Sequence, residues 1–336
     1  MMWTKKVPVY AVAAAWVIGA GGCFLLMSHK EHRPAPRGIR TVVPAAQETP
    51  CTYNIQRLKG FSYISPLVSA EPECESPRMH DMKQAIIQAI DTFRAAGVLQ
   101  KASVYVRDFK RGDWITVNGN ETYDPGSMLK VPVMMTYLKM AEEDPQLFNH
   151  SMRYTPVEMP GAAFPASAMI AEGTDYTVPD LLKYTIERSD NRANLVLLQN
   201  INMDMFHHTF TDLGLPDFET GALFYPMTAP DYATFFKVLY NSSLLSPRTS
   251  EYAMELLLHS EFQQGLLQGI PEGVQVAHKF GEAGDRTMGQ LHESGIVYLK
   301  NDPYLIVVMT KGTDIHALPH VLGSISSIVY DSISGA

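Results

Sequence analysis

Residues 124–130 read Asp-Pro-Gly-Ser-Met-Leu-Lys, and this stretch decides how the chain is interpreted. Pro125 and Gly126 predict a turn, and the apolar run that follows predicts a long helix that begins at or just after Ser127. Ser127 and Lys130 are three residues apart, so a helix places them on one face. Its N-terminal end also brings a positive partial charge to the serine hydroxyl.

A serine hydroxyl is a poor nucleophile until a base removes its proton. A lysine can be that base where burial and neighbouring positive groups lower its pKa. The pattern therefore favours a nucleophile and base pair. The alternative is a serine that caps the helix, followed by an ordinary surface lysine.

Patterns on either side of this stretch predict a sheet built from both ends of the chain around a helical insert. Apolar spacing predicts a helix over residues 79–97, and alternation around a Lys-Arg-Gly turn predicts a β-hairpin over residues 102–120. Helical patterns dominate residues 126–260. Strands are predicted again after Gln275, and a helix is predicted over residues 320–334.

Two further short motifs follow in order. Ser189-Asp190-Asn191 lies at a break between two helical segments, and Lys279-Phe280-Gly281 lies on a predicted strand in the last quarter of the chain. Taken alone, the first is an ordinary helix-ending sequence and the lysine of the second is a solvated charge.

Together the three motifs resemble those of class A β-lactamases and penicillin-binding proteins, whose signature is S-x-x-K, S-D-N and K-T-G. The resemblance covers residues 78–336. It implies an α/β (α+β) fold of the β-lactamase type, with an antiparallel sheet flanked by helices and a helical lobe at about residues 126–260. It also implies a site between the sheet and the lobe.

The resemblance implies the following catalytic roles. Ser127 attacks the carbonyl of a β-lactam or of an acyl-D-Ala-D-Ala peptide, and Lys130 accepts its proton. Ser189 relays a proton to the leaving nitrogen. Lys279 faces the substrate carboxylate and Ser189, where its charge favours an anion.

Binding roles follow in the same way. Asn191 is expected to hydrogen-bond the side-chain amide of the substrate. The backbone N–H groups of Ser127 and Glu282 are expected to form the oxyanion hole, in which loss of one donor costs about 10²–10³ in rate. Gly281 leaves room for substrate along the strand edge. Asp190 is expected to hold its own loop.

The chain departs from the family pattern at two places. Phe280 replaces the usual threonine, and loss of one hydrogen bond to a charged group is worth about 1.5–3 kcal/mol. The family's deacylating glutamate also lacks a clear counterpart, because the loop before Met227-Thr228 is short. Glu219 is the one glutamate there, and a solvated loop carboxylate is the alternative. We therefore expect acylation to be supported and fast deacylation not to be.

Three functions are compatible with these motifs. The first is a β-lactamase-family serine hydrolase with slow deacylation. The second is a D,D-carboxypeptidase or endopeptidase that acts on peptidoglycan stem peptides. The third, motivated by Phe280 and the short loop, is a catalytically retired domain that binds wall peptide or a membrane partner.

The N-terminal region predicts a membrane anchor. After a short tail of residues 1–6, residues 7–27 contain no charged side chain and are long enough to span a bilayer core. A cleaved signal peptide is the alternative. Residues 28–50 read as a linker and residues 51–77 as irregular structure on the domain surface, so 28–77 precedes the domain. We expect a single-pass protein of the cell membrane with an extracytoplasmic body.

Such a body permits a disulfide between Cys51 and Cys74, and two unpaired thiols are the alternative. The net charge is −8, although residues 1–40 are basic, so the body is acidic and no nucleic-acid partner is expected. The 11 histidines include no H-E-x-x-H pair, so no metal is expected, and no cofactor is expected either.

Overall fold

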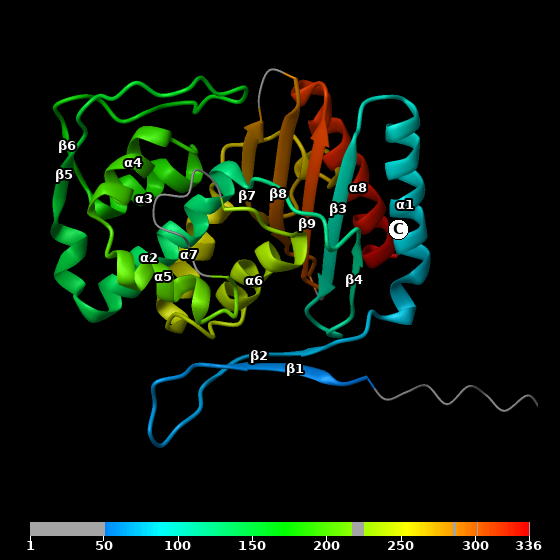
Figure 1. Ribbon diagram of the computed structural model, residues 1–336, viewed down its shortest axis with the longest axis horizontal. Helices are drawn as coiled ribbons and strands as arrows, with labels where there is room; N and C mark the ends of the chain where they lie inside the picture. Colours follow the sequence, from blue (N-terminus) through cyan, green and yellow to red (C-terminus); the bar gives the residue numbers. More distant parts are fainter. Residues whose placement is uncertain (1–50, 217–224, 285–286, 301, 336) are drawn as a thin grey trace, which may run out of the picture. The chain divides into compact units, whose positions relative to one another are not determined.

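A computed structural model describes residues 51–216, 225–284, 287–300 and 302–335, which belong to a compact unit of residues 50–336. Its centre is a five-stranded antiparallel sheet of order β4-β3-β9-β8-β7 (Figure 1). The strands of this sheet are β3 (Lys101–Asp108), β4 (Trp114–Val117), β7 (Val276–Gly284), β8 (Gly289–Val297) and β9 (Tyr304–Gly312). Residues 101–117 and 276–312, which are far apart in the chain, thus share one sheet.

Two helices cover one face of the sheet and a helical lobe covers the other (Figure 1). The first face packs against α1 (His80–Ala95) and α8 (Leu318–Ser334). The lobe contains η2 (Gly126–Leu129), α2 (Lys130–Glu143), α3 (Val178–Glu187), α4 (Asn191–Asn200), α5 (Met203–Thr211), α6 (Ala229–Tyr240) and α7 (Pro247–Leu258). Four shorter elements are η1 (Pro77–Met79), η3 (Pro145–Asn149), η4 (Leu266–Gly269) and η5 (Ile315–Ala317).

The sheet separates two hydrophobic cores because successive side chains of a strand point to opposite faces. On β3, Val104 and Val106 belong to the core with α1 and α8, whereas Tyr105 belongs to the core of the lobe. On β9, Val307 faces the lobe and Val308 faces the opposite side. Burial on both faces explains why β9 is almost continuously apolar.

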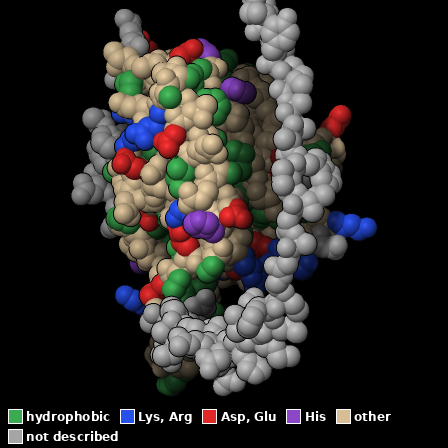
Figure 2. Space-filling view, turned by 90° about the vertical axis from the view of Figure 1, so that its right-hand side faces the viewer, with side chains coloured by type: hydrophobic (Ala, Val, Ile, Leu, Met, Phe, Trp, Pro, Cys, Tyr) green, Lys and Arg blue, Asp and Glu red, His purple; other side chains and the backbone are tan. Residues whose placement is uncertain are grey.

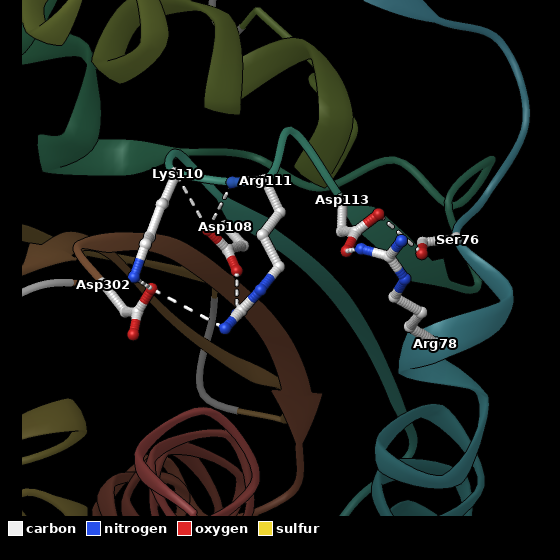
Figure 3. A network of polar contacts seen from close by, with 7 residues as sticks. All are labelled: Ser76, Arg78, Asp108, Lys110, Arg111, Asp113 and Asp302. Atoms are coloured by element: carbon white, nitrogen blue, oxygen red, sulfur yellow. Dashed lines mark hydrogen bonds and ion pairs between the residues drawn. The ribbon is translucent and has the colours of Figure 1, made fainter.

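The turn between β3 and β4 is held by a group of charged side chains (Figure 3). Asp108 accepts backbone N–H groups from Lys110 and Arg111 at 2.8 and 3.0 Å and an Arg111 guanidinium N–H at 2.7 Å. Lys110 also lies 3.0 Å from Asp302 of the β8–β9 connection. Ser76 donates to Asp113 at 2.8 Å. The turn is thereby joined to the neighbouring connection and to the segment before η1.

Most predicted elements are confirmed. The helix expected over residues 79–97 is α1, the hairpin over 102–120 is β3–β4, and the last helix is α8. Helices fill the predicted lobe from η2 to α7. The fold is therefore the expected antiparallel sheet flanked by helices with a helical lobe.

The segment of residues 51–77 differs from the expected irregular structure. It contains an antiparallel pair of strands, β1 (Tyr53–Arg57) and β2 (Leu67–Pro72), in which Ile55 lies opposite Ala70. A disulfide joins Cys51 to Cys74 across the ends of this hairpin, as the first reading of these two cysteines expected. The hairpin was missed because its polar and apolar residues do not match the pattern of a strand buried against a core.

The predicted anchor, residues 7–27, lies outside the described residues. Within residues 51–335, as far as the structure describes them, no helix is both long and apolar enough to cross a membrane.

Figure 2 shows the face of the molecule that lies at the right of Figure 1. Acidic and basic side chains are interspersed on the described part of this face rather than gathered by sign.

Candidate active site

Five of the predicted site residues come together from three places in the fold. Ser127 lies on the single turn η2, and Lys130 is the first residue of α2 directly after it. Ser189 and Asn191 lie where α3 ends and α4 begins, and Lys279 lies on the edge strand β7. In a 3₁₀ turn, residues i and i+3 are aligned along the axis, so η2 points Ser127 and Lys130 in the same direction.

The amino group of Lys130 is surrounded by four acceptor atoms. Its Nζ lies 2.6 Å from the carbonyl oxygen of Ser189 and 2.7 Å from Oδ1 of Asn191. It lies 3.0 Å from Oγ of Ser127 and 3.1 Å from Oγ of Ser189. The side chain is 2 % exposed, and burial lowers the pKa of Lys130 to about 7.

These contacts suit a neutral amine that acts as a base. A carbonyl and an amide oxygen can only accept, so they take both hydrogens of an uncharged –NH₂ group. The lone pair then remains for a hydroxyl. With a pKa of about 7, a large share of Lys130 is uncharged at neutral pH, and Ser127 supplies a hydroxyl at hydrogen-bond distance.

Ser189 lies between the two lysines in a strained conformation. Its φ of 58° is in the left-handed region, which costs a non-glycine residue about 1–2 kcal/mol. Lys279 donates to its Oγ at 2.8 Å, and Lys130 contacts both its Oγ and its carbonyl oxygen. These contacts keep the hydroxyl where it can pass a proton between Lys130 and a leaving atom.

Lys279 is completely buried rather than open to the cleft. It donates to Oγ of Ser189 and, at 3.0 Å, to the carbonyl oxygen of Phe280. Burial, together with the nearby Lys130, holds the pKa of Lys279 well below its usual value. The expected contact with Ser189 is present, whereas direct contact with a substrate carboxylate would require Lys279 to become accessible.

Asp190 has the expected structural role. Its Oδ1 accepts the N–H of Arg192 and caps α4, and its Oδ2 accepts the N–H of Ile170, each at 2.8 Å. The carboxylate is fully buried. It therefore joins the Ser189 turn to the loop of residues 154–174, hereafter the β5–β6 loop, between β5 (Ser151–Arg153) and β6 (Asp175–Thr177).

Two glycines allow η2 to approach β7. A Cβ on Gly281 would lie 2.2 Å from the carbonyl oxygen of Pro125, and a Cβ on Gly126 would lie 2.1 Å from that of Glu282. Gly126 also has a φ of 53°, which L side chains rarely adopt. The segments that carry the N–H groups of Ser127 and Glu282, the two expected oxyanion-hole donors, are thus in contact.

Ser127 opens into a cavity of about 230 Å³ that the β5–β6 loop covers. The loop contributes Met159 to Ala162, Phe164 to Ala166 and Met169 to the lining, and the lobe contributes Ser189, Asn191 and Arg192. Figure 1 shows the loop extending from the β5–β6 end of the lobe towards β7. The many Pro, Gly and Ala residues of this loop are the sequence feature from which an irregular segment could have been predicted.

A larger cavity, of about 470 Å³, lies against the β1–β2 hairpin. Two of its charged members, Glu71 and Lys237, are paired at 2.8 Å, and none of the predicted site residues lines it. The candidate active site is therefore the smaller cavity, which both Ser127 and Ser189 line.

Phe280 is 6 % exposed and belongs to an aromatic cluster. Its ring stacks on Phe262 with centroids 4.0 Å apart, and Phe164 of the β5–β6 loop lies edge-on to both. The residue that replaces the family threonine thus anchors the loop that covers the cavity. It supplies no hydrogen-bond donor to a substrate.

The side chain of Glu282 lines the same cavity. Its Oε2 accepts the N–H groups of Ala163 and Phe164 at 3.0 and 3.1 Å. Burial raises the pKa of this carboxyl above its usual value, although the two N–H groups act in the opposite direction. The sequence assigned only the backbone of Glu282 to the site, so its carboxylate is an addition.

His292 on β8 is a second residue that sequence reasoning missed. Its Nδ1 accepts the N–H of Thr310 at 3.1 Å, so Nε2 carries the hydrogen and donates to the carbonyl oxygen of Asp124 at 3.0 Å. Burial lowers the pKa of His292 to about 3, and the ring is uncharged. It fixes the start of the turn that carries Ser127. A single histidine within a strand gives no pattern from which this could be predicted.

Glu219 lies outside the described residues, so its role as a deacylating base stays a prediction. Among the described residues, no three His, Cys, Asp or Glu side chains gather as a metal site would require.

The antiparallel sheet with its helical lobe, together with the arrangement of Ser127, Lys130 and Ser189, is typical of serine hydrolases of the β-lactamase type. Comparisons with known proteins agree with this class. The family model described as "Beta-lactamase enzyme family" matches residues 83–333. The β-lactamase VEB-1 of Pseudomonas aeruginosa is 21 % identical over 214 residues, which are 58 % of this chain and 72 % of that protein. The chain therefore belongs to the β-lactamase enzyme family.

Solved structures share the fold. PBP-A has a TM-score of 0.64 at 18 % identity, covering 78 % of this chain and 98 % of its own. A β-lactamase from Sphaerobacter thermophilus also has a TM-score of 0.64 at 18 % identity, covering 75 % and 98 %. A mutant of PBP-A, with a TM-score of 0.63 at 18 % identity over 77 % and 98 %, was solved as an acyl-enzyme complex with penicillin G.

Proposed function

We propose that the chain is a serine acyl-hydrolase that forms an acyl-enzyme at Ser127 with β-lactams or D-Ala-D-Ala-like peptides and releases the acyl group slowly. The observation that carries this proposal is the position of Lys130, whose amine is buried, has a lowered pKa and lies 3.0 Å from Oγ of Ser127. A domain without catalysis would have no need for a buried amine beside Ser127, or for the strained backbone of Ser189 next to it.

Acylation would use these residues in sequence. Lys130 accepts the proton of Ser127 as Oγ attacks the carbonyl carbon, and the backbone N–H groups of Ser127 and Glu282 stabilise the oxyanion. The proton then passes from Lys130 through Ser189 to the leaving nitrogen as the carbon–nitrogen bond breaks. In a β-lactam the leaving nitrogen stays attached, so the whole molecule remains on Ser127.

Slow release of the acyl group is expected because the described lining of the cavity offers no unengaged carboxylate to act as a base. Glu282 is the one carboxylate among its described lining residues, and its Oε2 already accepts two N–H groups. A water attacking the ester needs a base within hydrogen-bond reach, and an engaged carboxylate is poorly suited to that task.

Labelling with a fluorescent penicillin tests the proposal. We expect a covalent adduct on the wild-type chain and none on Ser127→Ala, and we expect the adduct to persist after free penicillin is removed. Equal labelling of the two chains would contradict the assignment of the nucleophile. Rapid loss of the adduct would contradict slow release, and Glu219→Gln would then identify whether that residue is the base.

We also propose that residues 7–27 anchor the protein in the cell membrane, with residues 50–336 outside the cytoplasm. The disulfide between Cys51 and Cys74 supports this location because disulfides persist in oxidising compartments. The β1–β2 hairpin also exposes large apolar side chains, as expected of a surface close to lipid headgroups. They are Tyr53, Ile55, Phe61, Tyr63, Ile64 and Leu67.

Protease treatment of intact cells tests the location. We expect residues 50–336 to be degraded from outside, and fractionation to find the untreated chain with the membrane. Full protection in intact cells, with degradation only after lysis, would contradict the proposed orientation.

A further inference from the structure

The side of the cavity that receives the leaving group can be identified from proton transfer. The leaving atom must lie within hydrogen-bond reach of a proton donor. That donor is the hydroxyl of Ser189, whose Oγ lies 3.1 Å from Nζ of Lys130 and accepts from Lys279 of β7 at 2.8 Å. The leaving group therefore lies along the β7 wall, beyond Ser189, whereas Asn191 and Arg192 line the lobe wall.

The β7 wall offers little to an anion. Lys279 has no exposed surface, and its amino group is engaged by Ser189 and by the carbonyl oxygen of Phe280. Phe280 presents an aromatic ring. The next residue to line the cavity is Glu282, whose carboxylate is held there by the N–H groups of Ala163 and Phe164. The charged side chain of β7 that lines the cavity is therefore an acid, whereas the buried Lys279 does not line it.

The opposite wall carries a cation. Arg192 lines the cavity beside Asn191, donates to the carbonyl oxygen of Ile170 at 3.3 Å and lies over the ring of Tyr154. The two walls thus differ in charge, with the acid on the side of the leaving group. In a partly buried site, unlike charges attract and like charges repel strongly at short range.

We propose that Glu282 selects the leaving group: the cavity favours acyl donors whose leaving group is neutral or cationic and disfavours those that carry a carboxylate there. This inference rests on the proposed acylation of Ser127 and narrows its substrate class. β-Lactams and peptides that end in D-Ala-D-Ala, which carry a carboxylate on the leaving-group side, then acylate Ser127 more slowly than donors whose leaving group is neutral or cationic. The preferred natural donor is then a peptide bond that continues into an amide or an amine-bearing residue, rather than one that ends in a free carboxylate.

Thioesters of one N-acylglycine test this proposal, because only the leaving thiol changes between them. The three thiols are thioglycolate, thioglycolamide and thiocholine, which are anionic, neutral and cationic. Ser127 forms an ester with the acyl group, the carbon–sulfur bond breaks, and the proton of Ser127 leaves on the free thiol. Thiol release reports the rate of acylation in its first turnover.

The variant Glu282→Gln removes the charge and keeps an oxygen that can accept from Ala163 and Phe164. The intrinsic reactivities of the thioesters cancel when the rate ratio of two donors in the wild type is divided by the same ratio in the variant. We expect the preference for the neutral over the anionic thioester to fall about tenfold or more in Glu282→Gln. The preference for the cationic over the anionic thioester should fall further.

Glu261→Gln is the matched control. Glu261 is bound by Ser167 of the β5–β6 loop and by Arg188, so it also holds the loop, but it does not line the cavity. Its ratios should equal those of the wild type. Ratios that stay within about twofold of the wild type in Glu282→Gln would overturn the proposal. An equal change of all three rates would also overturn it, because Glu282 would then only hold the β5–β6 loop in place.

Failure of the underlying function would look different. In that case none of the three thioesters would acylate Ser127 in the wild type or in Glu282→Gln, and the proposed function would be overturned together with this inference. Acylation that is lost in Ser127→Ala but is indifferent to the charge of the thiol would overturn this inference alone.

Discussion

Lys130 and Ser127 show how far a local pattern can be interpreted. Their spacing of three residues predicts a shared direction, and both lie on η2 and the start of α2 as expected. What the sequence could not predict is the set of acceptors around Nζ. Asn191 and the carbonyl oxygen of Ser189 are supplied by a turn more than 50 residues away, so the charge state of Lys130 depends on tertiary structure.

The pH dependence of acylation follows from that charge state. Because the pKa of Lys130 is lowered to about 7, the free amine is present above pH 7 and is lost as the pH falls. The first-order rate of acylation at saturating donor should fall about tenfold per pH unit below pH 6. Stopped-flow or quenched mass spectrometry measures it, and a rate that is constant between pH 5 and 8 would contradict the assignment of Lys130 as the base.

His292 is a positioning residue that no sequence motif indicates. His292→Leu should leave the N–H of Thr310 and the carbonyl oxygen of Asp124 unpaired and lower the free energy of unfolding by about 1–3 kcal/mol for each. Acylation should slow while its pH profile keeps the same inflection, because His292 titrates near pH 3.

Two conservative variants separate its contacts. The amide nitrogen of His292→Gln can replace Nε2 as the donor to Asp124, whereas the shorter amide of His292→Asn replaces only Nδ1, as the acceptor for Thr310. We expect the glutamine variant to recover more of the acylation rate. A His292→Leu chain that is less stable but is acylated at the wild-type rate would limit His292 to a structural role.

At the scale of elements, the approach of η2 to β7 has a direct test. In Gly281→Ala the new Cβ would meet backbone atoms of Pro125 and Met128 at 2.2 and 2.7 Å, so either segment must shift. We expect a loss of about 1–3 kcal/mol in the free energy of unfolding, as overpacking costs in a close-packed interior, together with slower acylation.

Gly161→Ala is the control for this change, because a Cβ there would meet nothing within 4 Å. Denaturant unfolding should show no loss of stability for Gly161→Ala. Equal stability of Gly281→Ala and the wild type would show that β7 can move away from η2, which would contradict the close approach as a requirement of the site.

Long periodic elements could be predicted and short or irregular ones could not. In α1 the buried Met82, Ile86 and Ile90 repeat at helical spacing, so periodicity alone identifies the helix. By contrast, β5 and β6 have three residues each, too few for alternation to be recognised. The β5–β6 loop that covers Ser127 is held by the distant partners Asp190, Glu282 and Phe280, which no local pattern connects to it.

Over the whole molecule, the sheet built from both chain ends could be predicted because strand patterns occur on both sides of a long helical insert. The β1–β2 hairpin is the main part of the fold that could not be predicted from the sequence. Its polar residues Gln56, Ser69 and Glu71 face the cavity under it, whereas Tyr63 is 99 % exposed. This is the reverse of the pattern that a strand packed on a core displays.

The disulfide of the hairpin should stabilise the fold without affecting chemistry. A bridge that closes a loop of this length contributes about 3 kcal/mol in the chain-entropy description, and Cys51 and Cys74 do not line the cavity of Ser127. The double variant Cys51→Ser/Cys74→Ser should melt at a lower temperature in differential scanning calorimetry and be acylated at the wild-type rate. A large loss of acylation in folded protein would contradict the separation of the hairpin from the site.

The central claim is that Ser127 is the nucleophile of a working acylation site, and mapping of the adduct tests it most directly. The chain is treated with penicillin G at saturating concentration, digested and analysed by tandem mass spectrometry. We predict one adduct with the full mass of penicillin, carried by Ser127, absent in Ser127→Ala and greatly reduced in Lys130→Met. No adduct in the folded wild-type chain, or an adduct on another residue that persists in Ser127→Ala, would contradict the account.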